Sequence, residues 1–152
     1  MKVIKFRAIA KCIHNWDGYN ELYNVNEGDM AYGYYYQDAI NNEDSDSAIH
    51  VDYIRIPYGD HFADIEIDPE TLKQYTGIKD SKGVDIYEGD IVKCQHGWLG
   101  IVRYFESSAH YACEEIITKA INSHAPIFDK WSDLEVTGNI YEHSDLLKEN
   151  KE

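Results

Sequence analysis

The residues best suited to bind a metal are two Cys/His pairs. The segments Cys94-Gln95-His96 and His110-Tyr111-Ala112-Cys113 together offer two sulfur and two nitrogen atoms, the ligand types of a tetrahedral zinc site. Neither segment has the close cysteine-to-cysteine spacing that is typical of zinc fingers and ribbons. We therefore interpret these residues as ordinary core and surface residues, and we predict neither a metal nor a cofactor.

The acidic residues do not form a calcium loop, and catalytic motifs are missing. A calcium loop that began at Asn42 would have Ser47 where glycine is needed and Tyr53 where glutamate is needed. The sequence contains no G-x-S-x-G elbow, no Walker lysine loop and no G-x-G-x-x-G motif. Carboxylate pairs such as Asp85 with Glu88 are expected by chance among 28 acidic residues. We predict that the protein is not an enzyme.

Charge restricts the classes of partner. The 14 basic and 28 acidic residues give a net charge of -14, which disfavours attraction to nucleic acid and to anionic lipid. Residues 38–70 contain ten of the acidic residues, against a single arginine, Arg55, and no lysine. We interpret this segment as a solvated face with a mobile acidic loop at about 41–47. The alternative is an acidic mimic of nucleic acid that inhibits a host DNA-binding enzyme, which would require carboxylates at steps of about 3.4 Å.

The sequence carries no signal for a membrane or for secretion. No run approaches the roughly 20 apolar residues of a membrane helix, and the opening MKVIKFRAIAKC lacks the features of a secretory leader. The three cysteines are an odd number, which favours free buried thiols over disulfides. We expect a cytoplasmic protein with no membrane partner.

Alternation of apolar and polar residues predicts short strands. It is clearest over residues 2–9, 50–56 and 63–67, where alternate side chains would face opposite sides of a sheet. Frequent turn-forming residues between the runs favour an all-β, mainly antiparallel fold, built as a bent sheet, a small barrel or a sandwich. No change in composition marks a boundary, so we predict one domain over residues 1–152.

Helical signals are few and short. Asp68 followed by proline predicts one or two helical turns over residues 69–74. Ser144 predicts a short terminal helix, after which residues 148–152 form a frayed tail. Residues 109–121 suit either a strand or a helix, and we favour a strand.

The most ordered stretch of the sequence is YTGIKDSKGVDIYEGDIV, residues 75–92. Residues 80–83 predict a tight turn that closes a hairpin, because aspartate can accept hydrogen bonds from the following backbone and glycine supplies a positive φ. Residues 88–90 predict a second bend that leads into a new strand. Gly97 and Gly100 then predict bulges or corners in its partner strand.

Two further local patterns stand out in the sequence. Residues 26–30 (NEGDM) resemble residues 87–91 (YEGDI), which we interpret as coincidence, with two similar turns into strands as the alternative. The stretch AYGYYY puts Tyr34 and Tyr36 on one side of any strand and Tyr35 on the other, so at least one ring should be exposed. We favour a two-sided strand over an exposed protein-binding strip.

Three blocks of sequence, in this order, resemble the YopX family of phage and prophage proteins. They are residues 4–8 (IKFRA), 75–92 and 134–142 (LEVTGNIYE), whereas residues 11–72 and 106–133 carry little resemblance. The proline that the family has before its terminal helix is missing here. The resemblance implies a mainly β fold, a phage or prophage origin, a place in the host cytoplasm and no established biochemical activity.

We predict a phage or prophage accessory protein that acts by protein–protein contacts with an unknown host or phage protein. The sequence leaves the oligomeric state open, self-association included. The alternative for the matching blocks is that turns and strand ends require their residues. The predicted contact residues are of two groups. Those in and just after the central block look exposed: Tyr87, Glu88, Asp90 and Trp98. Those of the closing block are Asn139, Tyr141 and Glu142.

A further alternative is binding of single-stranded nucleic acid by the strands of the central block. Tyr87, Trp98 and Tyr104 would stack on bases, as aromatic residues do in small β-barrels. Only Lys93 and Arg103 would offer positive charge to the phosphates there. Direct binding of nucleic acid is therefore disfavoured.

Overall fold

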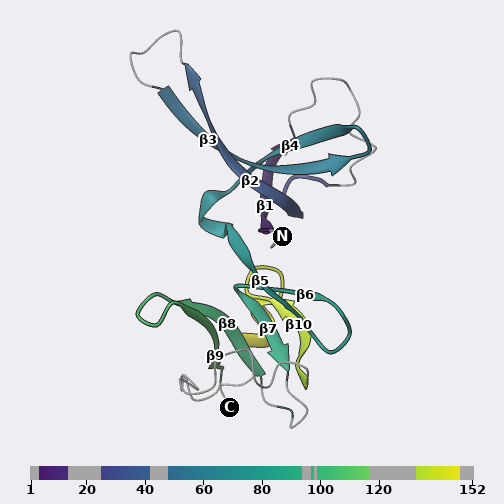
Figure 1. Ribbon diagram of the computed structural model, residues 1–152, viewed down its shortest axis with the longest axis vertical. Coiled ribbons are helices and arrows are strands. Elements are labelled where there is room, and N and C mark those ends of the chain that lie inside the picture. The colour runs from purple at the N-terminus through teal and green to yellow at the C-terminus, as the bar shows by residue number, and fades with distance from the viewer. Residues whose placement is uncertain are drawn as a thin grey trace. The chain divides into compact units, whose positions relative to one another are not determined.

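The computed structural model describes residues 4–13, 25–41, 48–93, 97, 99–116 and 133–147. These residues form ten β-strands and two 3₁₀ helices, with no α-helix among them (Figure 1). All pairings between the described strands are antiparallel, which confirms the predicted all-β, mainly antiparallel fold. Residue contacts divide the chain into two compact units, the first ending at Gln74 and the second beginning at Tyr75. The single domain expected from the sequence stays a prediction.

The first unit is built on four strands that pair in a closed cycle. The pairings run β1–β2, β2–β3, β3–β4 and β4–β1, as in a small barrel. The cycle closes because the first half of β1 pairs with β2 and its second half pairs with β4, with a register shift between Ala10 and Cys12. The bounds are β1 (Phe6–Ile13), β2 (Met30–Asn41), β3 (Ala48–Tyr58) and β4 (His61–Ile67).

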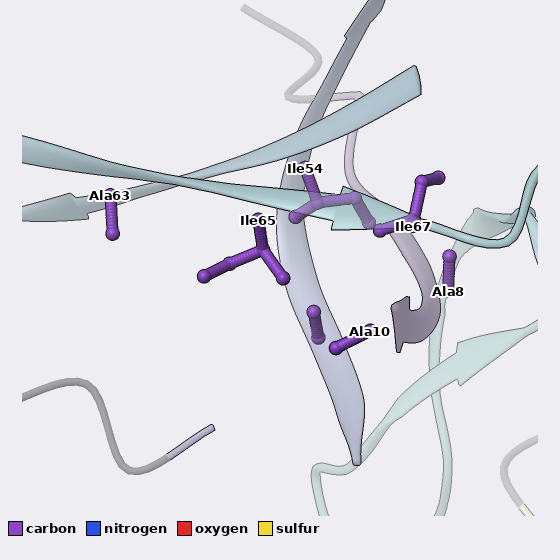
Figure 2. Close-up of a cluster of buried hydrophobic side chains, with 7 residues drawn as sticks. Ala8, Ala10, Ile54, Ala63, Ile65 and Ile67 are labelled. Carbon is purple, nitrogen blue, oxygen red and sulfur yellow. The ribbon is translucent and has the colours of Figure 1, made fainter. Parts of the chain in front are cut away.

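The core of the first unit combines alanines with isoleucines (Figure 2). Along β4, buried and less buried side chains alternate, which confirms the strand predicted at 63–67 and gives the sheet one core-facing side. The alanines of β1 and β2 leave room for the larger side chains of β3 and β4. The cluster consists of Ala8, Ala10, Ala31, Ile54, Ala63, Ile65 and Ile67.

A glycine allows β2 to change partners. Residues up to Gly33 pair with β1, and residues from Tyr34 onward pair with β3. A Cβ atom on Gly33 would lie 2.3 Å from the carbonyl oxygen of Arg55 and 3.0 Å from Cγ2 of Ile54. Because no side chain fits in that space, the close approach of β2 to β3 depends on glycine.

Near the end of the first unit lies a 3₁₀ helix, η1 (Pro69–Thr71), which is shorter than predicted. Asp68 caps it as expected, accepting a hydrogen bond from the backbone N–H of Glu70. The helix stops early because the chain returns to a sheet: β5 (Lys73–Lys79) begins at once and pairs with β1 through Lys73 and Gln74.

The second unit contains a hairpin and a four-stranded sheet. The rest of β5 pairs with β6 (Asp85–Tyr87), and the sheet has the strand order β10-β7-β8-β9. Its buried cluster is Ile86, Val92, Val102, Cys113 and Leu134. The bounds are β7 (Asp90–Lys93), β8 (Leu99–Phe105), β9 (His110–Glu115), β10 (Glu135–Asn139) and the 3₁₀ helix η4 (Ser144–Leu147).

The remaining predictions on local structure divide into those tested and those outside the described residues. Strand β9 confirms the choice of strand for residues 110–115, and η4 is the short helix expected after Ser144. The acidic loop from 42 onward, Trp98 and the 148–152 tail lie outside the described residues, as do Cys94 and His96. Among the described residues, no helix is long and apolar enough to cross a membrane, and no three potential metal ligands are grouped.

We predict that Gly33→Ala destabilises the first unit by about 1–3 kcal/mol, because the added methyl group would collide with backbone atoms of β3. Urea unfolding of the full chain would measure the loss. Ala39→Ser is the matched control, since Ala39 is an exposed residue of the same strand. Equal stability of Gly33→Ala and the control would contradict the close approach.

Candidate functional site

The side chains of β2, β3 and β4 that point away from the core form an outer face. The registers place Tyr34 opposite Arg55, and Arg55 opposite Asp64, so these three side chains share one side of the sheet. Ile54 and Ile65, their neighbours in sequence, lie on the other side and are fully buried. We define the outer-face cluster as Tyr34, Tyr36, Tyr53, Arg55, Phe62 and Asp64.

An arginine–carboxylate pair lies at the centre of the outer-face cluster. Arg55 Nε lies 2.7 Å from Asp64 Oδ1, and its Nη2 lies 2.8 Å from Oδ2, so the pair is bidentate. The guanidinium carbon lies 4.7 Å from the ring centre of Tyr36 and 5.5 Å from that of Phe62. Both distances allow cation–π attraction. The hydrogen bonds raise the pKa of Arg55 and hold the pKa of the Asp64 carboxyl below its ordinary value.

Tyr36 supports this pair from the neighbouring strand. Burial, together with hydrogen bonding to Asp64, raises the pKa of Tyr36 to about 12. Its ring stacks on Tyr53 with centroids 5.2 Å apart and planes inclined by 18°. The protonated hydroxyl group is the form that can donate to the Asp64 carboxylate.

Two rings of the outer-face cluster remain largely exposed. The relative exposure is 60% for Phe62 and 48% for Tyr34. Tyr35 points to the other side, where it packs against the core and its hydroxyl donates to Asp52 Oδ1 at 2.7 Å. The expected alternation of the tyrosines, with at least one exposed ring, is confirmed. The use of this surface for protein binding stays a prediction.

Sequence reasoning singled out the tyrosines but missed Arg55 and Phe62. These two residues belong to other strands, and neither stands in a motif. The signal that was available is the alternation of β3 and β4, which puts both residues opposite the buried isoleucines. Combining that alternation with the β2 pattern would have required the register of the three strands.

The predicted contact residues of the central block are less accessible than expected. Tyr87 is 4% exposed and Asp90 is 1% exposed, so the expectation that both are exposed was wrong. The reason is structural: an Asp90 carboxylate oxygen lies 2.7 Å from the backbone N–H of Tyr87 and accepts its hydrogen bond. Glu88 is half-buried between them, and Trp98 lies outside the described residues.

The contact residues of the closing block form a turn after β10. Asn139 is buried, and its Oδ1 accepts hydrogen bonds from the backbone N–H groups of Tyr141 and Glu142, both at 3.0 Å. Its Nδ2 donates to the Glu142 carboxylate. The preceding Gly138 is needed because a Cβ there would lie 2.7 Å from the ring of His143. These contacts agree with the interpretation that turns require the block, and a binding role for its residues stays a prediction.

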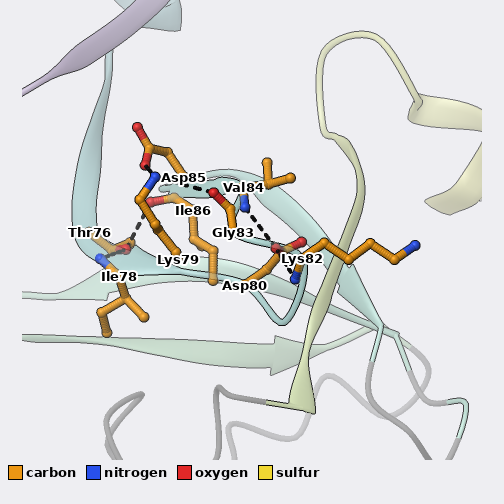
Figure 3. Close-up of polar contacts among 9 residues, drawn as sticks. All are labelled: Thr76, Ile78, Lys79, Asp80, Lys82, Gly83, Val84, Asp85 and Ile86. Carbon is orange, nitrogen blue, oxygen red and sulfur yellow. Dashed lines mark hydrogen bonds and ion pairs between the residues drawn. The ribbon is translucent and has the colours of Figure 1, made fainter.

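Asp80 organises the turn between β5 and β6 (Figure 3). Its Oδ1 accepts hydrogen bonds from the backbone N–H groups of Lys82 and Val84, at 2.8 and 2.9 Å. Gly83 has a φ of 83°, so the predicted tight turn is confirmed. The other carboxylate oxygen, Asp80 Oδ2, accepts a hydrogen bond from the backbone N–H of Val136 in β10 at 3.0 Å. The local pattern did not predict this contact.

The pKa of Asp80 is lowered by these contacts. Burial alone would raise the pKa of this carboxyl group, but the hydrogen bonds from the Val136, Val84 and Lys82 amides outweigh burial, and the Lys82 charge adds to them. The ionised form is therefore the one that the fold stabilises.

The two similar motifs form the same kind of turn. In each, the aspartate accepts a hydrogen bond from the backbone N–H three residues earlier, at 2.8 Å for Asn26 and 2.7 Å for Tyr87. Gly28 and Gly89 have positive φ angles of 89° and 81°, and each donates its N–H to a neighbouring strand at 2.8 Å. The structure therefore favours the alternative of two similar turns into strands over coincidence.

This protein is a small all-β protein of antiparallel strands. Buried aspartate and asparagine side chains hold its turns, and one face of its first unit carries exposed aromatic rings. The chain belongs to the YopX protein family, whose model matches residues 5–148. The resemblance of the three blocks is thereby confirmed.

The chain resembles the crystal structure of protein EF1440 from Enterococcus faecalis, at 21% identity, over 97% of this chain and 99% of that one, with a TM-score of 0.46. The curated proteins contain no match.

We predict that Asp80→Asn lowers the free energy of unfolding at pH 7 by about 1–3 kcal/mol, because an amide cannot accept all three hydrogen bonds. Urea unfolding measures the change. Asp60→Asn is the matched control, since Asp60 lies in an exposed two-residue turn. A loss no larger than that of the control would refute the role of Asp80.

The stability of the wild-type protein and that of Asp80→Asn should depend differently on pH. The folded pKa of Asp80 is depressed, so its stabilisation is present above the unfolded pKa of about 3.9 and is lost as pH falls through the folded pKa. We expect the stability difference between the protein and Asp80→Asn to be full at pH 7 and to shrink below about pH 3.9. Unfolding curves at several pH values test this, and a difference independent of pH would speak against it.

Proposed function

We propose that this YopX-family protein is a non-catalytic accessory factor of phage or prophage origin that binds another protein in the host cytoplasm. The observation that carries the proposal is the outer-face cluster, in which Tyr34 and Phe62 stay largely exposed beside a fixed ion pair. Aromatic and arginine side chains are enriched in protein interfaces, and exposed apolar surface that is rimmed by polar residues marks interaction sites. The outer face is therefore the surface on which we expect a protein partner.

The ordering of the cluster adds to this proposal. Arg55 is held by two hydrogen bonds and Tyr36 by stacking on Tyr53, so these side chains lose little rotational freedom when a partner binds. A surface that is ordered in advance binds at lower entropic cost.

The acidic-mimic alternative receives less support from the described carboxylates. A mimic needs its carboxylates turned outward in a regular row. Asp52 instead accepts hydrogen bonds from Tyr35 and Gln37, Asp64 pairs with Arg55, and Asp68 caps η1. Several acids of the segment thus serve the fold.

Binding of single-stranded nucleic acid also receives less support. The ring of Tyr87, which would have to stack on a base, is buried and packs against Tyr75 with centroids 5.5 Å apart. Arg103 is paired with Glu114, which reduces the positive charge available to phosphates.

We predict that the double variant Tyr34→Ser/Phe62→Ser loses its partner in affinity capture from host lysate. The tagged protein, the double variant and Tyr104→Ser are compared by mass spectrometry after washes at low and high salt. Tyr104 is the matched control because it is a 44% exposed tyrosine on a strand of the second unit. Circular dichroism checks that each variant is folded.

The expected result is a protein that stays bound to the wild type and to Tyr104→Ser after washes that remove it from the double variant. Capture that is equal for all three proteins would overturn the outer face as the binding surface. Nucleic acid in the eluate without protein would favour the single-strand alternative. A DNA-binding enzyme that all three proteins retain at low salt alone would favour mimicry.

A further inference from the structure

We infer that the partner presents arginine side chains to the outer face, and that Tyr34 and Phe62 receive their guanidinium groups. This inference rests on the proposed function, and it names the chemistry of the partner. Three observations carry it: the way the face holds its own arginine, the exposure of the two rings, and the charge of the surrounding chain.

The outer face already binds one guanidinium group, that of Arg55. The group lies 4.7 Å from the ring centre of Tyr36 and 5.5 Å from that of Phe62, with two hydrogen bonds to Asp64. Planar guanidinium groups stack on aromatic rings and pair with carboxylates in this way, whereas ammonium groups do so less well. The face therefore shows the combination of ring and carboxylate that recognises arginine.

Ring surface remains for further cations. Phe62 is still 60% exposed with Arg55 in place. Tyr34 lies directly opposite Arg55 on the neighbouring strand and is 48% exposed. Because Asp64 neutralises Arg55, that arginine does little to repel a second guanidinium group at Tyr34. Asp38 follows Tyr34 and Tyr36 on the same side of β2, is exposed, and can pair with an arriving cation.

The charge of the chain around the face favours a basic partner over other occupants. Residues 25–72 contain twelve acidic residues and a single basic residue, Arg55. A second copy of the chain would bring the same negative charge, and nucleic acid would be repelled as well. A neutral apolar segment could cover the rings but would bring no positive charge to this acidic surface. An arginine-rich segment satisfies both the rings and the charge.

Labelled octapeptides test the inference with the full chain at physiological salt. Fluorescence anisotropy would compare an alternating arginine–serine peptide, its lysine–serine counterpart and an isoleucine–serine peptide. We expect the arginine peptide to bind more tightly than the lysine peptide. We expect Tyr34→Ser/Phe62→Ser to weaken arginine-peptide binding about 5- to 30-fold, and Tyr104→Ser to leave it within about twofold.

The outcomes separate this inference from the proposed function. Equal binding of arginine and lysine peptides that no substitution changes would show attraction by net charge alone and would overturn the inference. Binding of the isoleucine peptide, weakened by the double variant, with no binding of the arginine peptide, would overturn the inference and leave the proposed function standing. Failure of the proposed function appears separately, as a captured protein that the double variant retains.

Discussion

The second unit depends on one buried carboxylate. Backbone N–H groups in a turn need acceptors, and removing a carboxylate from water is costly unless several donors replace the water. Asp80 meets both demands, since it takes two donors from its own turn and one from β10. These three hydrogen bonds set the shape of the β5–β6 hairpin and hold β10 beside it. Just before β10, Leu134 enters the core, and its carbonyl oxygen accepts a hydrogen bond from the backbone N–H of Ser81.

The same device recurs at other turns of the chain. Asp29 and Asp90 each satisfy an amide at the entrance to a strand, and Asn139 satisfies two amides after β10. The blocks that identify a YopX protein thus build turns. The outer face lies outside those blocks, on β2, β3 and β4, within the residues that the family model also matches.

What could be predicted from sequence was local. Alternation located β3 and β4, and the Asp80 turn followed from aspartate and glycine chemistry. Tyr87 and Asp90 misled because a Y-E-G-D turn looks exposed, whereas its burial depends on strands distant in sequence: Gly89 donates to Val102 and accepts from Ile140. The outer-face cluster required the register of three strands, which no single segment contains.

The tie between Asp80 and β10 also affects the order of events during synthesis. Asp80 and Val136 are 56 residues apart, so at translation rates of about 5–20 residues per second Val136 is added roughly 3 to 11 s after Asp80. Until then the hairpin turn holds a carboxylate that lacks its third donor and a core that lacks Leu134. Folding of the nascent second unit is therefore completed only after β10 has been synthesised. A chain stalled before β10 would expose this hairpin to chaperones and proteases.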